Sequence, residues 1–167
     1  MVSSKELDAL RSQVVQALPG WTILVIQFNG LIADRLGVTQ TDLQCLYALA
    51  HHSPASVSDL ARRVNLTSGA ASRMIDRLEA AGCIRRVPDP HDRRRVLIEP
   101  SPQSLEQVSR YYTPLNARLH EDLAEFSQKD LEQLLHFVTA AEDSTEAEIH
   151  RVSSIPKGDS TAQPHRP

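Results

Sequence analysis

The chain has 167 residues, of which 41% are hydrophobic and 4% are aromatic, and its formal net charge is −3 at pH 7. This length is enough for one sizeable hydrophobic core, and the net charge alone argues against a nucleic-acid-binding protein. No stretch is predicted to be long and apolar enough to span a membrane, and no basic-then-apolar signal segment is found at the N-terminus. We therefore expect a cytoplasmic protein with no membrane partner.

The charges are distributed unevenly along the chain. Residues 61–95 contain nine arginines and four acidic residues, a local charge of +5, so the remaining residues together carry −8. An asymmetry of this kind attracts DNA to one face of a protein and repels it from the others. Duplex DNA is therefore a candidate partner despite the negative net charge.

The N-terminal segment predicts two helices. Residues 4–18 carry an apolar stripe at helical spacing, and the Pro-Gly pair at 19–20 predicts a break in the chain. Residues 21–36 predict a second helix that is apolar on most of its sides, and such a helix must be covered nearly all round. One small domain is insufficient for this, so we expect a second subunit and an obligate dimer.

The next segment predicts a third helix that ends near residue 51. Gly37 ends the preceding helix, and either Thr39 or Thr41 is a suitable N-cap. His51 and His52 lie at the exit, but no third ligand follows at a spacing typical of a metal site. We therefore predict neither a metal ion nor another cofactor.

Two short helices joined by a tight turn are predicted next. Ser58 is a good N-cap for a helix over 59–64, and Asn65 suits the left-handed conformation that stops a helix. Thr67 then caps a helix over 68–81. The short turn between them is typical of a helix-turn-helix motif.

The second of these helices has a polar face opposite its apolar stripe. Its first turn, residues 68–72, has almost only small side chains, which let a backbone approach DNA phosphates closely. Arg73 and Arg77, one turn apart, are placed to contact base edges, where an arginine binds guanine through two hydrogen bonds. Taken alone, the pattern also fits a surface helix with solvated arginines.

An arginine-rich hairpin is predicted after this helix. Residues 83–87 and 95–99 are strand candidates, and two prolines stiffen the loop that joins them. Arg93, Arg94 and Arg95 alternate along the ribbon, so at least one is expected to point outward, where it can enter a DNA minor groove. An exposed charged hairpin is the alternative. The whole order of elements is that of a winged helix-turn-helix.

The C-terminal part predicts two long helices, over 102–126 and 128–152. Pro114 is expected to kink or interrupt the first, and Ser127 to cap the second. Together with the N-terminal helices they are predicted to form an all-helical dimer interface, with packing inside one chain as the alternative. Residues 153–167 are polar and aperiodic and are predicted to be a disordered tail.

The only two cysteines are Cys45 and Cys83. Both lie in apolar contexts and are predicted to be buried structural thiols, since a disulfide is rare in the cytoplasm. The arginines that follow Cys83 make it the better candidate of the two for a redox-active thiol.

Two motifs in this region resemble those of a known family. LEAAGCIRR at 78–86, followed by DPHDRRR at 89–95, is similar to the MarR family of bacterial winged helix-turn-helix transcriptional regulators. The resemblance covers about residues 21–150. One departure follows the second strand, where the family often has Leu-Thr-x-x-Gly and this chain has PSPQS at 100–104.

The resemblance implies a mainly α fold with a small β-wing. Residues 37–100 are predicted to form the winged helix-turn-helix DNA-binding domain, and residues 1–36 and 101–152 the helical dimerisation region. We expect a homodimeric, sequence-specific transcriptional regulator, a repressor rather than an enzyme, on a pseudo-palindromic duplex operator. A winged-helix module for protein–protein interaction, without strong DNA binding, is the alternative.

The candidate site residues form two sets. The DNA-binding set comprises Thr67, Ser68, Gly69, Ala70, Ser72, Arg73, Arg77, Arg86, Arg93, Arg94 and Arg95. The resemblance further implies a small, often aromatic effector between the dimer helices and the DNA-binding lobe. Its candidate lining residues, each of which also fits a core or interface position, are Trp21, Phe28, Tyr47, His51 and Tyr111.

Overall fold

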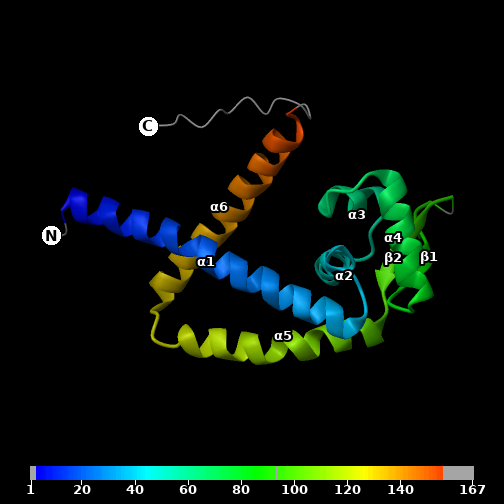
Figure 1. The fold of residues 1–167 in the computed structure, drawn as a ribbon, viewed down its shortest axis with the longest axis horizontal. Helices are drawn as coiled ribbons and strands as arrows, with labels where there is room; N and C mark the ends of the chain where they lie inside the picture. The colour runs from blue at the N-terminus through cyan, green and yellow to red at the C-terminus, as the bar shows by residue number, and fades with distance from the viewer. Residues whose placement is uncertain (1–2, 93, 156–167) are drawn as a thin grey trace, which may run out of the picture. The chain divides into compact units, whose positions relative to one another are not determined.

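The computed structural model describes residues 3–92 and 94–155 of the chain (Figure 1). It divides into two compact units, Met1–Leu115 and Asn116–Pro167. Within the described residues the first unit contains a helix-turn-helix with a two-stranded sheet, flanked by helical segments from both ends of that unit. The second unit is helical. The expectation of a mainly α fold with a small β-wing is confirmed.

The first helix, α1, runs without interruption over Ser4–Leu36 and has Pro19 inside it. The predicted break at 19–20 is therefore wrong. A proline removes only its own amide donor, and its fixed φ is compatible with a helix. Apolar residues on the two sides of the proline lie on the same face of one helix, because they recur every seven residues at Leu7, Val14, Trp21 and Phe28. The hydroxyl of Thr22 also donates to the carbonyl of Leu18 at 2.9 Å, next to the proline.

Most of α1 is exposed in the single chain, where only Ile32 and Ala33 are buried. Because α1 is continuous, it is long and apolar enough, by length and composition alone, to cross a membrane. No apolar stretch of this length is expected from the sequence alone, because the sequence predicts two separate helices on either side of residue 19. That expectation is wrong, since the two predicted helices are one. Core helices of soluble proteins meet the same two criteria.

The helix-turn-helix consists of α3 (Val57–Arg63) and α4 (Ser68–Ala80); α2 (Gln40–His52) precedes it, and β1 (Ile84–Pro88) and β2 (Val96–Pro100) follow it. These elements enclose the main core, which contains side chains from all five. The fully buried members include Leu49, Leu60, Met74, Ile75, Leu78 and Ile98. The core fixes α4 to the rest of the first unit through its apolar face.

Local capping explains most of the helix ends. Thr39 caps α2 in a capping box with Asp42, and Thr67 caps α4 by accepting the amide of Ala70. Asn65 has φ 50° in the turn, as predicted, and Gly82 has φ 70° after α4. The predicted cap of α3 is wrong by two residues, because Ser56 rather than Ser58 accepts the amide of Asp59.

The two strands pair in antiparallel fashion, with Arg85 opposite Glu99 and Arg86 opposite Ile98. Each strand begins one residue later than predicted. Ala55 forms a further bridge with Ile98, in which each amide donates to the other residue's carbonyl at 3.1 and 2.8 Å. The wing is therefore bonded to the segment that leads into α3.

The next helix, α5, spans Pro102–Asp122, and Pro114 lies inside it without interrupting it. Its first turn is tied to the wing, because the buried hydroxyl of Ser104 donates to the carbonyl of Cys83 at 2.7 Å. Within the first unit, Tyr112 packs edge-to-face on Phe28, and its hydroxyl donates to Asn29 of α1 at 2.7 Å. These contacts join α5 to α1.

The second unit contains the end of α5 and the helix α6, Gln128–Ser153. Ser127 caps α6 in a capping box with Asp130, as predicted. No residue of α6 is buried in the single chain, although an apolar stripe runs along it. Of the predicted tail, residues 156–167 lie outside the described residues, and Ser153 is the last residue of the helix.

Candidate nucleic-acid interface

The first turn of α4 is built from small side chains, of which only Ala71 is buried in the core. Ser68, Gly69 and Ser72 are exposed, and Ala70 is half-buried. A Cβ added at Gly69 would meet only the Arg73 guanidinium, at 3.8 Å. The chain therefore has room for a larger side chain here, and the small residues leave the helix N-terminus open to an outside partner.

The arginines of the basic segment fall into two groups. Five of the eight arginines described between residues 61 and 95 lie within 4 Å of a carboxylate of the same chain. They are Arg62, Arg77, Arg85, Arg86 and Arg95. The other three, Arg63, Arg73 and Arg94, are exposed and have no carboxylate within that distance among the described residues. Their charge is therefore uncompensated by any described neighbour.

Arg77, predicted to contact base edges, has a partner inside the protein instead. Its Nε donates to one oxygen of Asp42 at 3.1 Å and its Nη2 to the other oxygen. The Asp42 side chain is 1% exposed, whereas that of Arg77 is 53% exposed. Burial raises the pKa of the Asp42 carboxyl, but hydrogen bonds from Arg77 and from the Thr39 amide outweigh it and leave that pKa below its usual value.

Arg86, also predicted to bind DNA, bridges the wing and α4. From β1 its guanidinium binds Asp76 at 2.6 Å and also forms an ion pair with Glu79. Arg85, on the same strand, is paired with Glu99 of β2 at 2.8 Å. The structure thus places two wing arginines in contacts that hold the wing together and hold it to α4.

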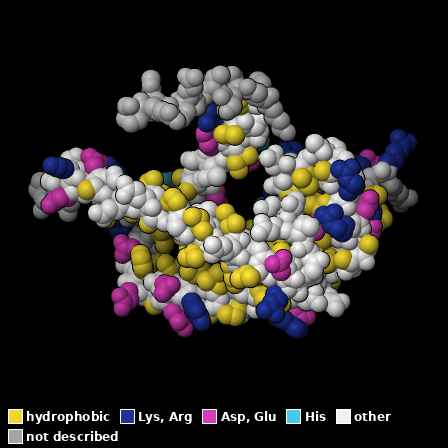
Figure 2. Space-filling model, viewed as in Figure 1, with side chains coloured by type: hydrophobic (Ala, Val, Ile, Leu, Met, Phe, Trp, Pro, Cys, Tyr) yellow, Lys and Arg dark blue, Asp and Glu magenta, His cyan; other side chains and the backbone are white. Residues whose placement is uncertain are grey.

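The wing tip is shaped by its acidic residues. Asp89 is buried, accepts the amide of His91 at 2.8 Å and lies 3.9 Å from the Arg95 guanidinium. Asp92 accepts the amide of Arg94 at 3.0 Å. This bond ties the Arg94 backbone to Asp92, while Arg93 lies outside the described residues. On the face drawn in Figure 2, basic side chains gather over α4 and the wing.

The aromatic residues predicted to line an effector site lie on three helices, α1, α2 and α5. Tyr47 and His51 stack within α2, with their ring centroids 4.4 Å apart. Trp21 is 60% exposed on α1, Tyr111 is exposed on α5, and Phe28 packs against Tyr112. Among the described residues, no aromatic ring pair joins one of these three rings to another member of the predicted set.

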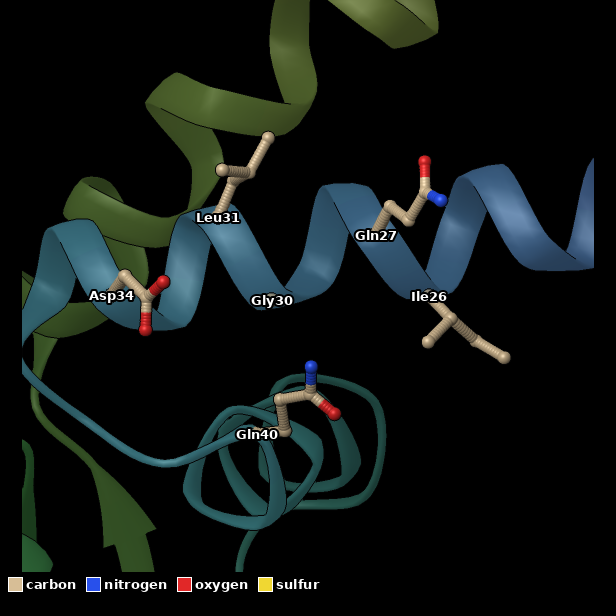
Figure 3. Close-up of a pocket in the computed structure, with 6 residues that line it drawn as sticks. All are labelled: Ile26, Gln27, Gly30, Leu31, Asp34 and Gln40. Atoms are coloured by element: carbon tan, nitrogen blue, oxygen red, sulfur yellow. The ribbon is translucent and has the colours of Figure 1, made fainter.

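The first unit does contain an open pocket of about 470 Å³ between α1 and the start of α2 (Figure 3). It is lined by Ile26, Gln27, Gly30, Leu31, Asp34 and Gln40. A Cβ at Gly30 would meet the side-chain amide of Gln40 at 2.8 Å, so the glycine leaves room for that side chain. None of the predicted effector residues lines this pocket.

Both cysteines are free thiols. Burial, followed by the nearby charge of Asp42, raises the pKa of Cys45 to about 12. The same two causes raise the pKa of the partly buried Cys83. A thiol with a raised pKa stays protonated at neutral pH, whereas a reactive cysteine requires the thiolate. Neither environment favours redox activity.

Two short helices at a tight turn, a wing and an uncompensated basic face define a winged helix-turn-helix protein of the DNA-binding class. The MarR family model matches residues 38–96. HTH-type transcriptional regulator YcgE of Bacillus subtilis is 32% identical over 150 residues, which are 90% of this chain and 96% of that protein. The chain belongs to the MarR family, and it is a transcriptional regulator rather than an enzyme.

Two further comparisons agree with this assignment. The multiple antibiotic resistance protein MarR of Salmonella typhimurium is 28% identical over 88 residues, 53% of this chain and 61% of that protein. A solved MarR family protein from Bacillus stearothermophilus has the same fold, with a TM-score of 0.63 at 17% identity. That likeness covers 83% of this chain and 96% of the other.

Proposed function

We propose that the protein is a cytoplasmic homodimeric repressor that binds a pseudo-palindromic operator, with α4 of each subunit in a major groove and each wing beside it. The observation that carries this proposal is the set of uncompensated arginines, Arg63, Arg73 and Arg94. They lie on α3, α4 and the wing, the three elements that such a domain presents to DNA. A dimer bound across a promoter blocks transcription.

The residues have different roles in this arrangement. Arg73 contacts base edges in the major groove, because it lies on α4 directly after the open first turn. The small residues of that turn approach phosphates, and they are Thr67, Ser68, Gly69, Ala70 and Ser72. Arg94, with Arg93 and Arg95, binds the minor groove and phosphates beside it. Arg63, which the predicted DNA-binding set did not include, is added as a phosphate contact on α3.

Alanine substitution at Arg73 and Arg94 separates the two kinds of contact. Arg73→Ala is expected to cost about 1–3 kcal/mol of operator binding and to relax the preference at one base pair in each half-site. Arg94→Ala is expected to weaken binding to all sequences and to flatten the salt dependence by about one unit for each phosphate that the arginine neutralises. Gel-shift titrations at several salt concentrations, on an operator selected from random duplex DNA, measure both effects.

Arg35→Ala is a matched control, because Arg35 is an exposed arginine at the end of α1, outside the basic face. It is expected to leave the affinity and its salt dependence unchanged. Unchanged operator affinity in both Arg73→Ala and Arg94→Ala would contradict the proposed interface.

Exposed apolar surface supports the proposal of a dimer. In the second unit, α6 exposes Leu131, Leu134, Leu135, Phe137, Val138, Ile149 and Val152. In the first unit, the exposed apolar side chains of α1 include Leu7, Leu10, Val14, Trp21, Ile23, Leu24 and Leu31. Exposed apolar side chains in such numbers along a helix mark an interaction site. We assign it to a second copy of the chain, as two symmetric subunits match a pseudo-palindromic operator.

Control by a small aromatic effector is also proposed, with the stacked Tyr47 and His51 as its best-supported contacts. Calorimetric titration with an aromatic acid such as benzoate, with and without operator, tests this. Coupling between the two sites requires the affinity for the acid to differ between the two conditions. Tyr47→Ala is expected to abolish the heat of binding. Equal affinity with and without operator would contradict the coupling.

A further inference from the structure

We propose that Asp42 is a positioning residue for DNA binding, which acts through Arg77 to fix the orientation of α4 without touching DNA. This inference depends on the proposed DNA-binding function and adds to it. It also changes the role of Arg77, from a base contact to the link between Asp42 and the recognition helix.

The geometry of the pair is directional. Two different nitrogens of Arg77 bind the two different oxygens of Asp42, so the guanidinium plane is held in one orientation. The pair joins the first turn of α2 to the last turn of α4. Apolar packing of Met74, Ile75 and Leu78 holds α4 against the core, but such contacts are non-directional. The ion pair adds a restraint on rotation of α4 about its own axis.

A second restraint acts on the same part of α4. Asp76 and Glu79 bind Arg86 of β1, so α4 is bonded to the wing next to the position at which it is bonded to α2. Neighbouring helix positions point about 100° apart. The two sets of ion pairs therefore hold the helix from two directions. If one set is lost, the rotation of α4 is restrained from one direction only.

The orientation of Arg77 determines where Arg73 points. The two residues are four positions apart on α4 and therefore lie on nearly the same side of the helix. Arg73 has no described carboxylate near it, whereas Arg77 is held by Asp42. A rotation of α4 that releases Arg77 moves the Arg73 guanidinium by a similar angle, and sites for specific contacts tolerate deviations of only about 10–20°.

Asp42 itself cannot contact DNA. Its side chain is 1% exposed, and its oxygens accept hydrogen bonds from Arg77 and from the Thr39 amide at 2.9 Å. A carboxylate at a DNA surface would also repel phosphates. Any effect of Asp42 on sequence preference must therefore pass through the helix that Arg77 belongs to.

The experiment is a double-mutant cycle with Asp42→Asn, Arg77→Gln and the double variant, measured well below their unfolding temperatures. Affinity is determined for the operator, for every single-base variant of it and for non-specific duplex DNA. Asp42→Asn is expected to weaken operator binding about tenfold, the size of one mismatched base pair, and leave non-specific binding unchanged. The preference for the operator base over the other bases is expected to fall at all base pairs under α4 together. The double variant is expected to bind the operator no more weakly than either single variant.

Glu106→Gln is the matched control. It removes one carboxylate from a surface ion pair with Arg110 on α5, outside the elements proposed to face DNA, with the same change of charge. Its discrimination profile is expected to match that of the wild-type protein. If Asp42→Asn does not fold, Arg77→Lys replaces it, since lysine keeps the charge but loses the two-point hydrogen bonding. The same loss across all positions under α4 is expected, in smaller amount.

The outcomes distinguish this role from the others. Relaxation at one base pair in Arg77→Gln, with an unchanged profile in Asp42→Asn, would show that Arg77 contacts a base and would overturn the proposal. If the loss of operator binding in Asp42→Asn is fully explained by the fraction of that variant that is unfolded, Asp42 has a structural role only. That result would also overturn the proposal. Absence of operator binding by the wild-type protein would contradict the proposed function itself.

Discussion

Leu135→Asp is expected to convert the proposed dimer to a monomer and to lower operator affinity by about 10²–10⁴-fold, because two linked domains bind far more tightly than one. Leu135 is 68% exposed in the single chain and lies on α6 in one stripe with Leu131, Leu134 and Val138. An aspartate there places a charge in an apolar interface. Sedimentation equilibrium measures the oligomeric state, and gel shift measures the affinity.

Gln133→Asp is the control for this prediction. At about 100° per residue, position 133 lies on the side of α6 opposite the stripe, and it is exposed. The substitution adds the same charge to the same helix and is expected to leave both the dimer and its affinity unchanged. A wild-type protein that is already monomeric at micromolar concentration would refute the dimer, as would a Leu135→Asp protein that remains dimeric.

Leu78→Ala is expected to lower the free energy of unfolding by about 2–5 kcal/mol, a large part of the roughly 5–15 kcal/mol of a typical domain. Leu78 is fully buried, and it packs from α4 onto the helix-turn-helix core. Its loss leaves a cavity that the surrounding helices fill only partly. Urea denaturation at a fixed protein concentration measures the change, since the stability of a dimer depends on concentration.

Arg73→Ala is the comparison for Leu78→Ala on the same helix. Arg73 is exposed and has no described carboxylate partner, so its removal is expected to change stability by no more than about 0.5 kcal/mol while weakening operator binding. The two faces of α4 thus have separate roles, one in folding and one in binding. A loss of less than about 1 kcal/mol in Leu78→Ala would show that this face does not hold α4 in place.

Local signals predicted several elements correctly. Thr67 and Ser127 are N-caps as expected, and Thr39 is the one of the two candidates, Thr39 and Thr41, that caps α2. A hydroxyl that accepts an amide two or three residues ahead is a local interaction. The apolar stripe of α4 is buried as its spacing predicted. Asn65 and Gly82 have the left-handed conformation that their residue types favour. Each of these features depends on residues only a few positions apart.

Longer-range effects explain where local prediction was wrong. Ser56 and Ser58 are both suitable caps for α3, and the sequence pattern favoured Ser58. The bridge between Ala55 and Ile98 holds the chain extended up to Ser56, so the helix begins directly after it. In α1 the local signal of Pro19 was overruled by an apolar phase that continues for the full length of the helix.

The sequence by itself determined the order of the elements, the basic segment and the membership of a regulator family, since spacing, residue type and charge are properties of short stretches of chain. Only the tertiary structure decided which arginines are available to a partner. Arg77 is paired with Asp42, 35 positions away, and Arg86 is paired across the wing with α4. An ion pair forms between side chains that folding brings within a few ångströms, and no local pattern encodes that distance.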